Sequence, residues 1–327
     1  MARKIAFNVA LFPTEPASET VRLGKLAERL GYEGLWVGDS HIIWRELYVL
    51  LGALASETRR IRIGSGVTHP HVRHLTLTAS AFVTLGELAK GRVRMGIGIG
   101  ASGPINIGVK RASLAELEAA VLNLRKLFKG EAVQFGGMEM RLMFAPNYEV
   151  SIYISASVPR TRELAVRIGD GVIGGGRKDV IGGWVESIRK GLKQAGRDAG
   201  SVKTVSWIPC SIAKDERVAR EAIKPHVARV GWTSFAKMVR EGQRVEEEDR
   251  RAAERIDREY DFSHHMGPEH SHLVPERWVD LFAVAGTPAQ VKVKIDEIMK
   301  SGVDIISIVP YGDKEPIIRD FAKKVIG

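Results

Sequence analysis

Strand-like and helix-like runs alternate along nearly the whole chain, and this rhythm limits the possible folds more than any other feature. Parallel strands need a long crossover connection, which is normally a helix, so the alternation predicts βα units around a parallel sheet. The clearest helix covers Thr20–Leu30 and ends at Gly31. Val21, Leu23 and Leu26 lie along one of its faces, which predicts a helix packed against a sheet.

The number of strands predicts how the sheet is organised. Eight strands, each followed by a helical segment, predict a closed (β/α)8 barrel, or TIM barrel, of the α/β class. A doubly wound open sheet is the alternative, because sequence patterns do not measure closure. The predicted strands are Lys4–Phe12, Gly34–Val37, Ile61–Val67, Val93–Gly98, Ser151–Ser155, Gly171–Gly174, Thr204–Ser211 and Asp304–Val309.

Two stretches interrupt the rhythm. Residues 131–147 carry a Gly-Gly pair between alternating segments, which predicts a small inserted hairpin. Residues 214–277 are far longer than a normal βα connection, and their charged helical pattern predicts a helical insertion late in the chain. We therefore predict one barrel domain over residues 1–327 that contains both insertions.

The charge of the chain bears on its partners. The formal net charge is +10, which favours a small polyanionic ligand over nucleic acid, and a solvated ionic surface is the alternative explanation for most of this charge. The basic residues are scattered among acids and form no arginine-rich arm, so we predict no nucleic-acid partner. No apolar run is long enough for a membrane span, and no signal peptide is recognisable. Cys210 is the single cysteine, and we expect a cytoplasmic protein that acts on a small-molecule substrate.

The segment 61–74, IRIGSGVTHPHVRH, is a strand that ends in small residues and continues into polar ones. A strand that ends at glycine lets a flat ligand approach the backbone. The polar residues that follow, including Thr68, Arg73 and His74, lie where barrel enzymes carry their catalytic groups. An ordinary glycine-rich βα loop is the alternative interpretation.

Asp39, His41 and Trp44 follow the second predicted strand. A carboxylate and an imidazole at the carboxyl end of a strand can exchange protons with a ligand bound there. Alternatively, Asp39 caps the next helix and His41 packs beside it.

Glycines follow the fourth predicted strand, in the segment 96–103. They loosely resemble a dinucleotide fingerprint, but no acid follows at the expected distance. Gly98 and Gly100 leave the backbone open, so that its amides are available for an anion or a ring carbonyl.

The segment 174–179, GGGRKD, opens a helix after the sixth predicted strand. Free amides and adjacent cations at the start of a helix suit a phosphate group. Two cations there are unfavourable to the helix dipole without an anion, so we predict that Gly175, Gly176 and Arg177 bind phosphate. An ordinary glycine-rich loop is the alternative interpretation. Ser155-Ala156-Ser157, after the fifth strand, would form the neighbouring wall.

Four histidines gather late in the chain, but their spacing matches no standard zinc pattern. We therefore predict a solvated loop and no metal site. The four residues are His264, His265, His270 and His272.

Taken together, these residues resemble the bacterial-luciferase-like superfamily and, within it, the coenzyme F420-dependent methylenetetrahydromethanopterin reductases. The resemblance covers nearly the whole chain. Its most specific pieces are Gly66-Val67-Thr68-His69-Pro70 through Arg73-His74, Leu75–Arg92, Ser151–Ser157, Gly169–Val172, Ala285–Pro288 and Pro310–Glu315.

The resemblance implies an F420-dependent oxidoreductase with a (β/α)8 barrel, a deazaflavin at the carboxyl ends of the strands, and a homodimer or homotetramer. It also implies a non-prolyl cis peptide at Gly66–Val67. Asp39 and His41 would exchange protons, and Trp44 would form a wall on the substrate side. The residues that would contact the cofactor are Asp39, Gly66, Val67, Thr68, Gly98, Gly100, Ala156, Ser157, Gly175, Gly176 and Arg177.

This chain departs from the family pattern at three points. Ser40 stands where the family has a histidine, with His41 one place later. Ala10 stands where the reductases carry a carboxylate, and Ala101 stands where relatives often place an acid. Two alternatives therefore stay open: an FMN-dependent monooxygenase, and a cofactor-binding protein without reductase activity.

Overall fold

The computed structural model describes residues 5–144, 147–175, 177–261 and 267–327. Its contacts divide the chain into two compact units. The first unit comprises Met1–Gly174, Glu186–Val205 and Asp304–Ser307, and the second comprises Gly175–Val185, Ser206–Val303 and Ile308–Gly327.

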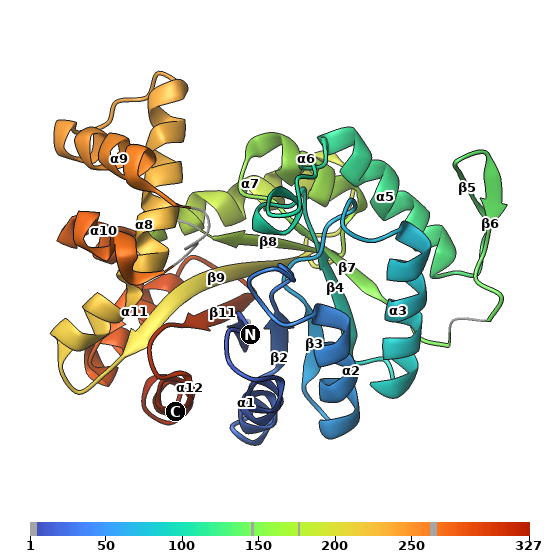
Figure 1. Cartoon of the computed structure of the whole chain (residues 1–327), viewed down its shortest axis with the longest axis horizontal. Coiled ribbons are helices and arrows are strands. Elements are labelled where there is room, and N and C mark those ends of the chain that lie inside the picture. The colour runs from blue at the N-terminus through green and yellow to red at the C-terminus, as the bar shows by residue number, and fades with distance from the viewer. Residues whose placement is uncertain (1–4, 145–146, 176, 262–266) are drawn as a thin grey trace. The chain divides into compact units, whose positions relative to one another are not determined.

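Eight parallel strands form a closed ring, which confirms the predicted barrel and excludes the open sheet (Figure 1). Hydrogen bonds within the first unit close it: the Lys203 amide donates to the Asp170 carbonyl at 3.0 Å, and the Ala6 amide donates to the Asp304 carbonyl at 3.0 Å. Asp304 also accepts from the amide of Thr204 at 2.9 Å. In chain order the strands are β1 (Ala6–Leu11), β2 (Gly34–Val37), β3 (Arg62–Ser65), β4 (Val93–Ile97), β7 (Ser151–Ser155), β8 (Gly171–Gly175), β9 (Lys203–Ile212) and β11 (Ile305–Pro310).

All eight predicted strands are present, with ends that differ by a few residues. The predicted third strand continued to Val67, but β3 ends at Ser65. Lys4, the first residue of the predicted first strand, lies outside the described residues. The helices that connect the strands are α1 (Ala17–Arg29), α2 (Leu47–Glu57), α3 (Leu75–Leu88), α4 (Ser102–Ile105), α5 (Leu114–Leu127), α6 (Pro159–Ile168) and α7 (Ile181–Gln194).

The sheet has one face toward the helices and one toward the barrel interior. Leu35 of β2 faces α1, because a Cβ on Gly24 would lie 3.0 Å from its side chain. The next residue, Trp36, therefore faces inward. Its ring lies edge-on to Tyr153 with the centroids 5.4 Å apart. A Cβ on Gly64 would lie 2.9 Å from the same indole, so glycine at that position makes room for a large interior side chain.

A short antiparallel hairpin follows α5 and precedes β7 in the chain, within the predicted insertion (Figure 1). It consists of β5 (Val133–Phe135) and β6 (Met138–Met140). Gly136 and Gly137 both have positive φ, as a two-residue hairpin turn requires. Phe135 packs edge-on against His74, the residue that caps α3, with ring centroids 4.6 Å apart. Residues 145–146 lie outside the described part of the chain.

The second unit contains most of the predicted helical insertion. Its helices are α8 (Glu216–Arg240), α9 (Glu247–Glu259), η3 (Pro268–Leu273), α10 (Glu276–Phe282), α11 (Pro288–Met299), α12 (Lys314–Asp320) and η4 (Phe321–Val325). An additional short strand, β10 (Val284–Gly286), pairs in parallel with β9, where Val284 is opposite the buried Cys210. The sequence patterns did not predict this strand. Whether the chain is one domain with two insertions stays a prediction.

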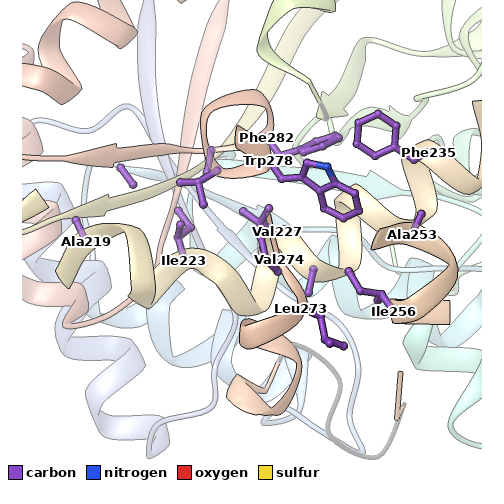
Figure 2. Close-up of a cluster of buried hydrophobic side chains, with 14 residues drawn as sticks. Ala219, Ile223, Val227, Phe235, Ala253, Ile256, Leu273, Val274, Trp278 and Phe282 are labelled. Carbon is purple, nitrogen blue, oxygen red and sulfur yellow. The ribbon is translucent and has the colours of Figure 1, made fainter. Parts of the chain in front are cut away.

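The helices of the second unit share a hydrophobic core (Figure 2). Trp278 of α10 is fully buried and packs against Phe235 of α8, with ring centroids 4.9 Å apart. A Cβ on Gly231 would lie 2.3 Å from the indole, so α8 needs glycine at this position. The indole Nε1 donates to Asp249 of α9 at 2.5 Å, which satisfies the polar atom inside the core.

Among the helices that the structure describes, none combines the length and apolar character needed to cross a membrane.

Candidate functional site

The carboxyl ends of β2, β3 and β4 bring together several residues predicted from the sequence. Asp39 follows β2, and Thr68 forms an isolated parallel bridge with Ile97 of β4. The Thr68 amide donates to the Gly96 carbonyl at 2.9 Å, and the Gly98 amide donates to the Thr68 carbonyl at 3.0 Å. These bonds extend the β3–β4 pairing beyond the end of β3 and fix Thr68 beside Asp39.

The Asp39 carboxylate lies at the centre of a buried network. Its side chain is 1% exposed and accepts hydrogen bonds from Thr68 Oγ1 at 2.7 Å and from both terminal nitrogens of Arg73, at 2.7 and 3.0 Å. Arg73 also donates to Glu46 at 2.5 Å, and its guanidinium lies 4.5 Å from the centroid of the Tyr48 ring. Such a bidentate pair suits a carboxylate that anchors the loop.

Burial alone would lower the pKa of Arg73, but the hydrogen bonds and charges of Asp39 and Glu46 raise it above its usual value. Arg73 therefore stays charged and fixes the orientation of Asp39. In the sequence, Arg73 stands out only as a polar residue after the third strand. Arg73 lies 34 positions after Asp39 in the chain, so no local sequence pattern indicated that the two side chains pair.

The peptide bond between Gly66 and Val67 is cis, as the family resemblance implied. The Val67 side chain lies over β4, because a Cβ on Gly96 would come within 3.1 Å of it and a Cβ on Gly98 within 3.3 Å. A Cβ on Gly96 would also lie 2.3 Å from the carbonyl oxygen of Ser65. Packing therefore explains these two glycines, whereas we had interpreted the glycine-rich segment as open backbone for a ligand.

Trp44 and Phe12 form a stacked aromatic pair in the loops that follow β2 and β1. Their ring centroids are 4.6 Å apart and the planes differ by 1°. Gly38 lies beneath both rings, since a Cβ there would be 2.7 Å from Phe12 and 2.8 Å from Trp44. The pair presents a flat apolar surface. His41, between Gly38 and Trp44, is only partly buried.

The remaining predicted contacts of the first unit lie after β4 and β7. Gly100 has a φ of +85°, and a Cβ there would meet Pro104 at 2.7 Å. Ala156 is fully buried, and its amide donates to the Ile173 carbonyl at 2.8 Å. Ser157 is exposed. His69, which we did not assign to the site, is buried next to Asp39.

The two alanines that depart from the family pattern lie at the ends of strands, Ala10 within β1 and Ala101 after β4. Glu15, in the loop after β1, could have supplied a carboxylate there. Its carboxylate accepts hydrogen bonds from Thr20 Oγ1 at 3.1 Å and Thr14 Oγ1 at 3.3 Å, and it thereby contributes to the start of α1.

The chain matches the family model described as luciferase-like monooxygenase over residues 6–304. It belongs to this family. Among the curated relatives of this luciferase-like chain is the 5,10-methylenetetrahydromethanopterin reductase of Methanolobus tindarius, which is 30% identical over 99% of this chain and 100% of the relative. The reductase of the same name from Archaeoglobus fulgidus is 31% identical over 98% of both chains.

A solved structure of a reductase is also similar to this chain over nearly its whole length. The coenzyme F420 dependent tetrahydromethanopterin reductase from Methanopyrus kandleri superposes on the luciferase-like chain with a TM-score of 0.82 and 25% identity, over 99% of both chains. The F420-dependent secondary alcohol dehydrogenase, solved with an F420-acetone adduct, gives a TM-score of 0.79 at 19% identity. The second likeness shows the fold alone.

The predicted phosphate loop belongs to the second unit. Gly175 ends β8, and Gly176 lies outside the described residues. Arg177 donates two hydrogen bonds to the Asp179 carboxylate, from Nε at 3.0 Å and from Nη2 at 2.5 Å. This hydrogen bonding raises the pKa of Arg177. Asp179 thus places a negative charge beside Arg177, so this cation at the start of the helix is balanced without a bound anion. Burial lowers the pKa of the next residue, Lys178, to about 8.

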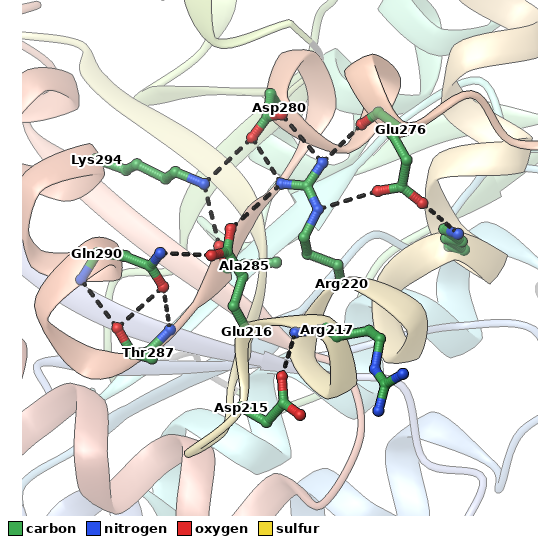
Figure 3. A network of polar contacts seen from close by, with 11 residues as sticks. Asp215, Glu216, Arg217, Arg220, Glu276, Asp280, Ala285, Thr287, Gln290 and Lys294 are labelled. Carbon is green, nitrogen blue, oxygen red and sulfur yellow. Dashed lines mark hydrogen bonds and ion pairs between the residues drawn. The ribbon is translucent and has the colours of Figure 1, made fainter.

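The start of α8 and α10 carries an ion-pair network (Figure 3). Arg220 pairs with Glu276 and Asp280, each at 3.0 Å, and Glu276 also pairs with Lys224 at 2.5 Å. Lys294 extends the network to Asp280 at 3.3 Å. Within the described ranges, no group of three or more His, Cys, Asp or Glu residues could hold a metal ion. The network consists of paired charges, in which the carboxylates are more than half exposed and the cations are mostly covered.

Proposed function

We propose that this luciferase-like protein is an F420-dependent oxidoreductase that transfers a hydride between the deazaflavin and an organic substrate. The observation that carries the proposal is the similarity over the whole chain to reductases, one of which is named as F420-dependent and superposes with a TM-score of 0.82. FMN is the alternative cofactor, because the family model is named for monooxygenases.

The residues of the first unit fit a flat, polar ring system. The loops after β3 and β4 carry several glycines, and a cis peptide joins Gly66 to Val67 in the first of them. The buried hydroxyl of Ser40, next to Asp39 in the chain, has no hydrogen-bond partner among the described residues. A bound heteroaromatic ring with carbonyl and N–H groups would supply such a partner.

In this proposal, F420 supplies the hydride chemistry when it is bound, and the protein supplies orientation and electrostatics. Gly66, Val67 and Thr68 would support the ring from β3. Arg73 would hold Asp39 in one orientation beside it. The other contacts of the ring would be Gly98, Gly100, Ala156 and Ser157.

The substrate would lie against the apolar surface of Trp44 and Phe12. His41, which is only partly buried, would exchange the proton that accompanies hydride transfer. Phosphate binding by Gly175, Gly176 and Arg177 stays a prediction from the sequence. The absence of acids at Ala10 and Ala101 supports a substrate that differs from that of the reductases, since a cationic substrate would favour an acidic partner.

Titration of the protein with F420 and with FMN tests the proposal. We expect F420 to bind at least about tenfold more tightly, which corresponds to about 1.4 kcal/mol. The F420 must be purified from a source that makes it, because a host without F420 would yield empty protein. Tighter binding of FMN would support the monooxygenase. Tight F420 binding without hydride exchange on any candidate substrate would support a cofactor-binding protein.

We further propose a homodimer or homotetramer located in the cytoplasm. Exposed apolar side chains on α2, α3 and the hairpin, which include Val49, Leu77 and Met138, support an interface on the first unit. Light scattering coupled to gel filtration tests the assembly, and a monomer at micromolar concentration would contradict it.

A further inference from the structure

A group of polar side chains lies inside the barrel, toward the amino ends of its strands. Trp36 of β2 faces inward, and Gly34, two residues earlier, lies on the same face of the strand. A Cβ on Gly34 would lie 2.8 Å from the side chain of Asn8 on β1, so Asn8 also points into the barrel. The proposed cofactor site lies at the opposite, carboxyl ends of the strands.

Arg94 of β4 belongs to the same interior group. Its guanidinium lies 5.6 Å from the centroid of the Tyr153 ring, and that ring lies edge-on to Trp36 with the centroids 5.4 Å apart. The Arg94 side chain is 5% exposed, and its Nη2 pairs with Glu33, which directly precedes β2. Tyr153 is therefore the shared neighbour of Arg94 and Trp36.

Several polar atoms of this group are buried and have no hydrogen-bond partner within the ranges that the structure describes. They are Nδ2 and Oδ1 of Asn8, Nε1 of Trp36, Nε and Nη1 of Arg94, and Oε2 of Glu33. Asn8 is 0% exposed and Trp36 is 1% exposed, so bulk solvent does not satisfy them. Exchanging the oxygen and nitrogen of the Asn8 amide changes nothing, because both atoms are among those without a partner.

The chemistry of these atoms indicates what would pair with them. A buried polar group without a partner costs free energy, and ordered water molecules usually satisfy the groups that protein atoms do not. Trp36 Nε1 and Arg94 Nε only donate, whereas the ionised Glu33 carboxylate only accepts. The Asn8 amide does both. Water also donates and accepts, so it suits this mixed set, whereas a bound anion would face the acceptor oxygens.

We propose that the barrel interior near the amino ends of the strands is a binding site for ordered water molecules, which bridge Asn8, Trp36 and the pair of Arg94 and Glu33. Glu33 offers a route of entry, because its side chain is 35% exposed while Oε2 is buried. None of these residues belongs to the proposed cofactor or substrate site. The hydration of the barrel therefore does not depend on the proposed function.

Cross-relaxation between water and the full-length protein, measured by NMR, tests the proposal. We expect the indole N–H of Trp36 to show a direct cross-peak with water, because it would donate to a bound molecule. Trp278 is the matched control, since its indole is also fully buried but its Nε1 already donates to Asp249 at 2.5 Å. No water cross-peak is expected for Trp278. A Trp36 N–H without a cross-peak would overturn the proposal.

A variant tests the contribution of Asn8. Asn8→Leu keeps much of the side-chain volume but removes both polar atoms, so the signal of long-lived internal water should fall in magnetic relaxation dispersion. Asn147→Leu, at an exposed position, should leave that signal unchanged. An equal signal in Asn8→Leu and the wild type would overturn the proposed bridge.

If Asn8→Leu does not fold, a crystal structure of the wild type decides the contribution of Asn8. We expect an ordered water molecule within about 3.2 Å of its amide. An amide without such a water molecule would contradict the proposal.

Discussion

Each unit contains an arginine that binds two carboxylates, but the surroundings of the two arginines differ. Arg73 in the first unit binds Asp39, whose side chain is 1% exposed, and Glu46. Arg220 in the second unit binds Glu276 and Asp280, which are 58% and 52% exposed. Both arginines thus bind carboxylates, but the Asp39 carboxylate is buried beside the proposed cofactor site, whereas those of Glu276 and Asp280 are open to water.

The comparison shows how burial decides what an ion pair does. In water, exposed charges gain little from pairing and lose little when a partner is removed. Inside the protein, the loss of one partner leaves the other as an unpaired buried charge. The pair of Arg73 and Asp39 is consequently suited to hold one fixed geometry, whereas the carboxylates around Arg220 keep much of their contact with water.

Replacing Arg73 should have the largest effect. Arg73→Met keeps much of the side-chain volume but leaves Asp39 buried without its cation. We expect the free energy of unfolding to fall by roughly 3–5 kcal/mol, measured by urea denaturation. A loss below about 1 kcal/mol would contradict the view that the buried pair fixes the geometry.

Removing the second donor to Asp39 should have an intermediate effect. Thr68→Val is close to isosteric and deletes a hydrogen bond to a charged group, so we expect a loss of about 1.5–3 kcal/mol. Thr68→Ser retains the hydroxyl and serves as the control. Equal stability of the two variants would show that the hydroxyl contributes nothing to holding Asp39.

Replacing Arg220, whose carboxylate partners are exposed, should cost less. Arg220→Met removes the ion pairs to Glu276 and Asp280, and we expect a loss of about 1 kcal/mol or less. The difference from the wild type should shrink in 1 M salt, because the charges are screened. A loss of stability as large as that of Arg73→Met would contradict the view that exposure of the carboxylates lowers the contribution of an ion pair.

The smallest effect concerns Lys178 and depends on pH. Burial, followed by the positive charge of Lys294, lowers its pKa from 10.5 to about 8. Between these two values the unfolded chain binds more protons than the folded one, so stability rises as the pH rises from about 8 to 10.5. We expect the wild type to gain less than about 1 kcal/mol over Lys178→Met in this range, since water partly screens the ammonium group.

Unfolding temperatures of the two proteins, measured in parallel from pH 7 to 10.5, provide the test for Lys178. Identical pH profiles would show that the ammonium group is fully solvated.

The strands were predictable from the sequence because their pattern is local. Each strand is a short apolar run bounded by glycine or polar residues, and the eight runs define the barrel once they are counted. The closure of the ring was not predictable in the same way. It depends on Asp304 bonding with Thr204, 100 residues earlier, and with Ala6 at the start of β1.

The candidate site was only partly predictable, for the same physical reason. Asp39 and Thr68 were identified because polar residues followed strands, but the cation that holds Asp39 came from a distant loop. A position can require glycine for several structural reasons, and these reasons cannot be told apart in a sequence. Gly96 and Gly98 are explained by the neighbouring Val67 side chain, which only the folded structure shows.

Cys210 gives the protein a built-in probe of local opening. The chain has no other thiol, and this one lies fully buried on β9 opposite Val284 of β10. Burial raises the pKa of the thiol, so it does not react as a thiolate in the native state. The rate at which a thiol reagent labels the protein therefore measures how often the β9–β10 pairing separates. The natural sequence permits this measurement without an engineered label.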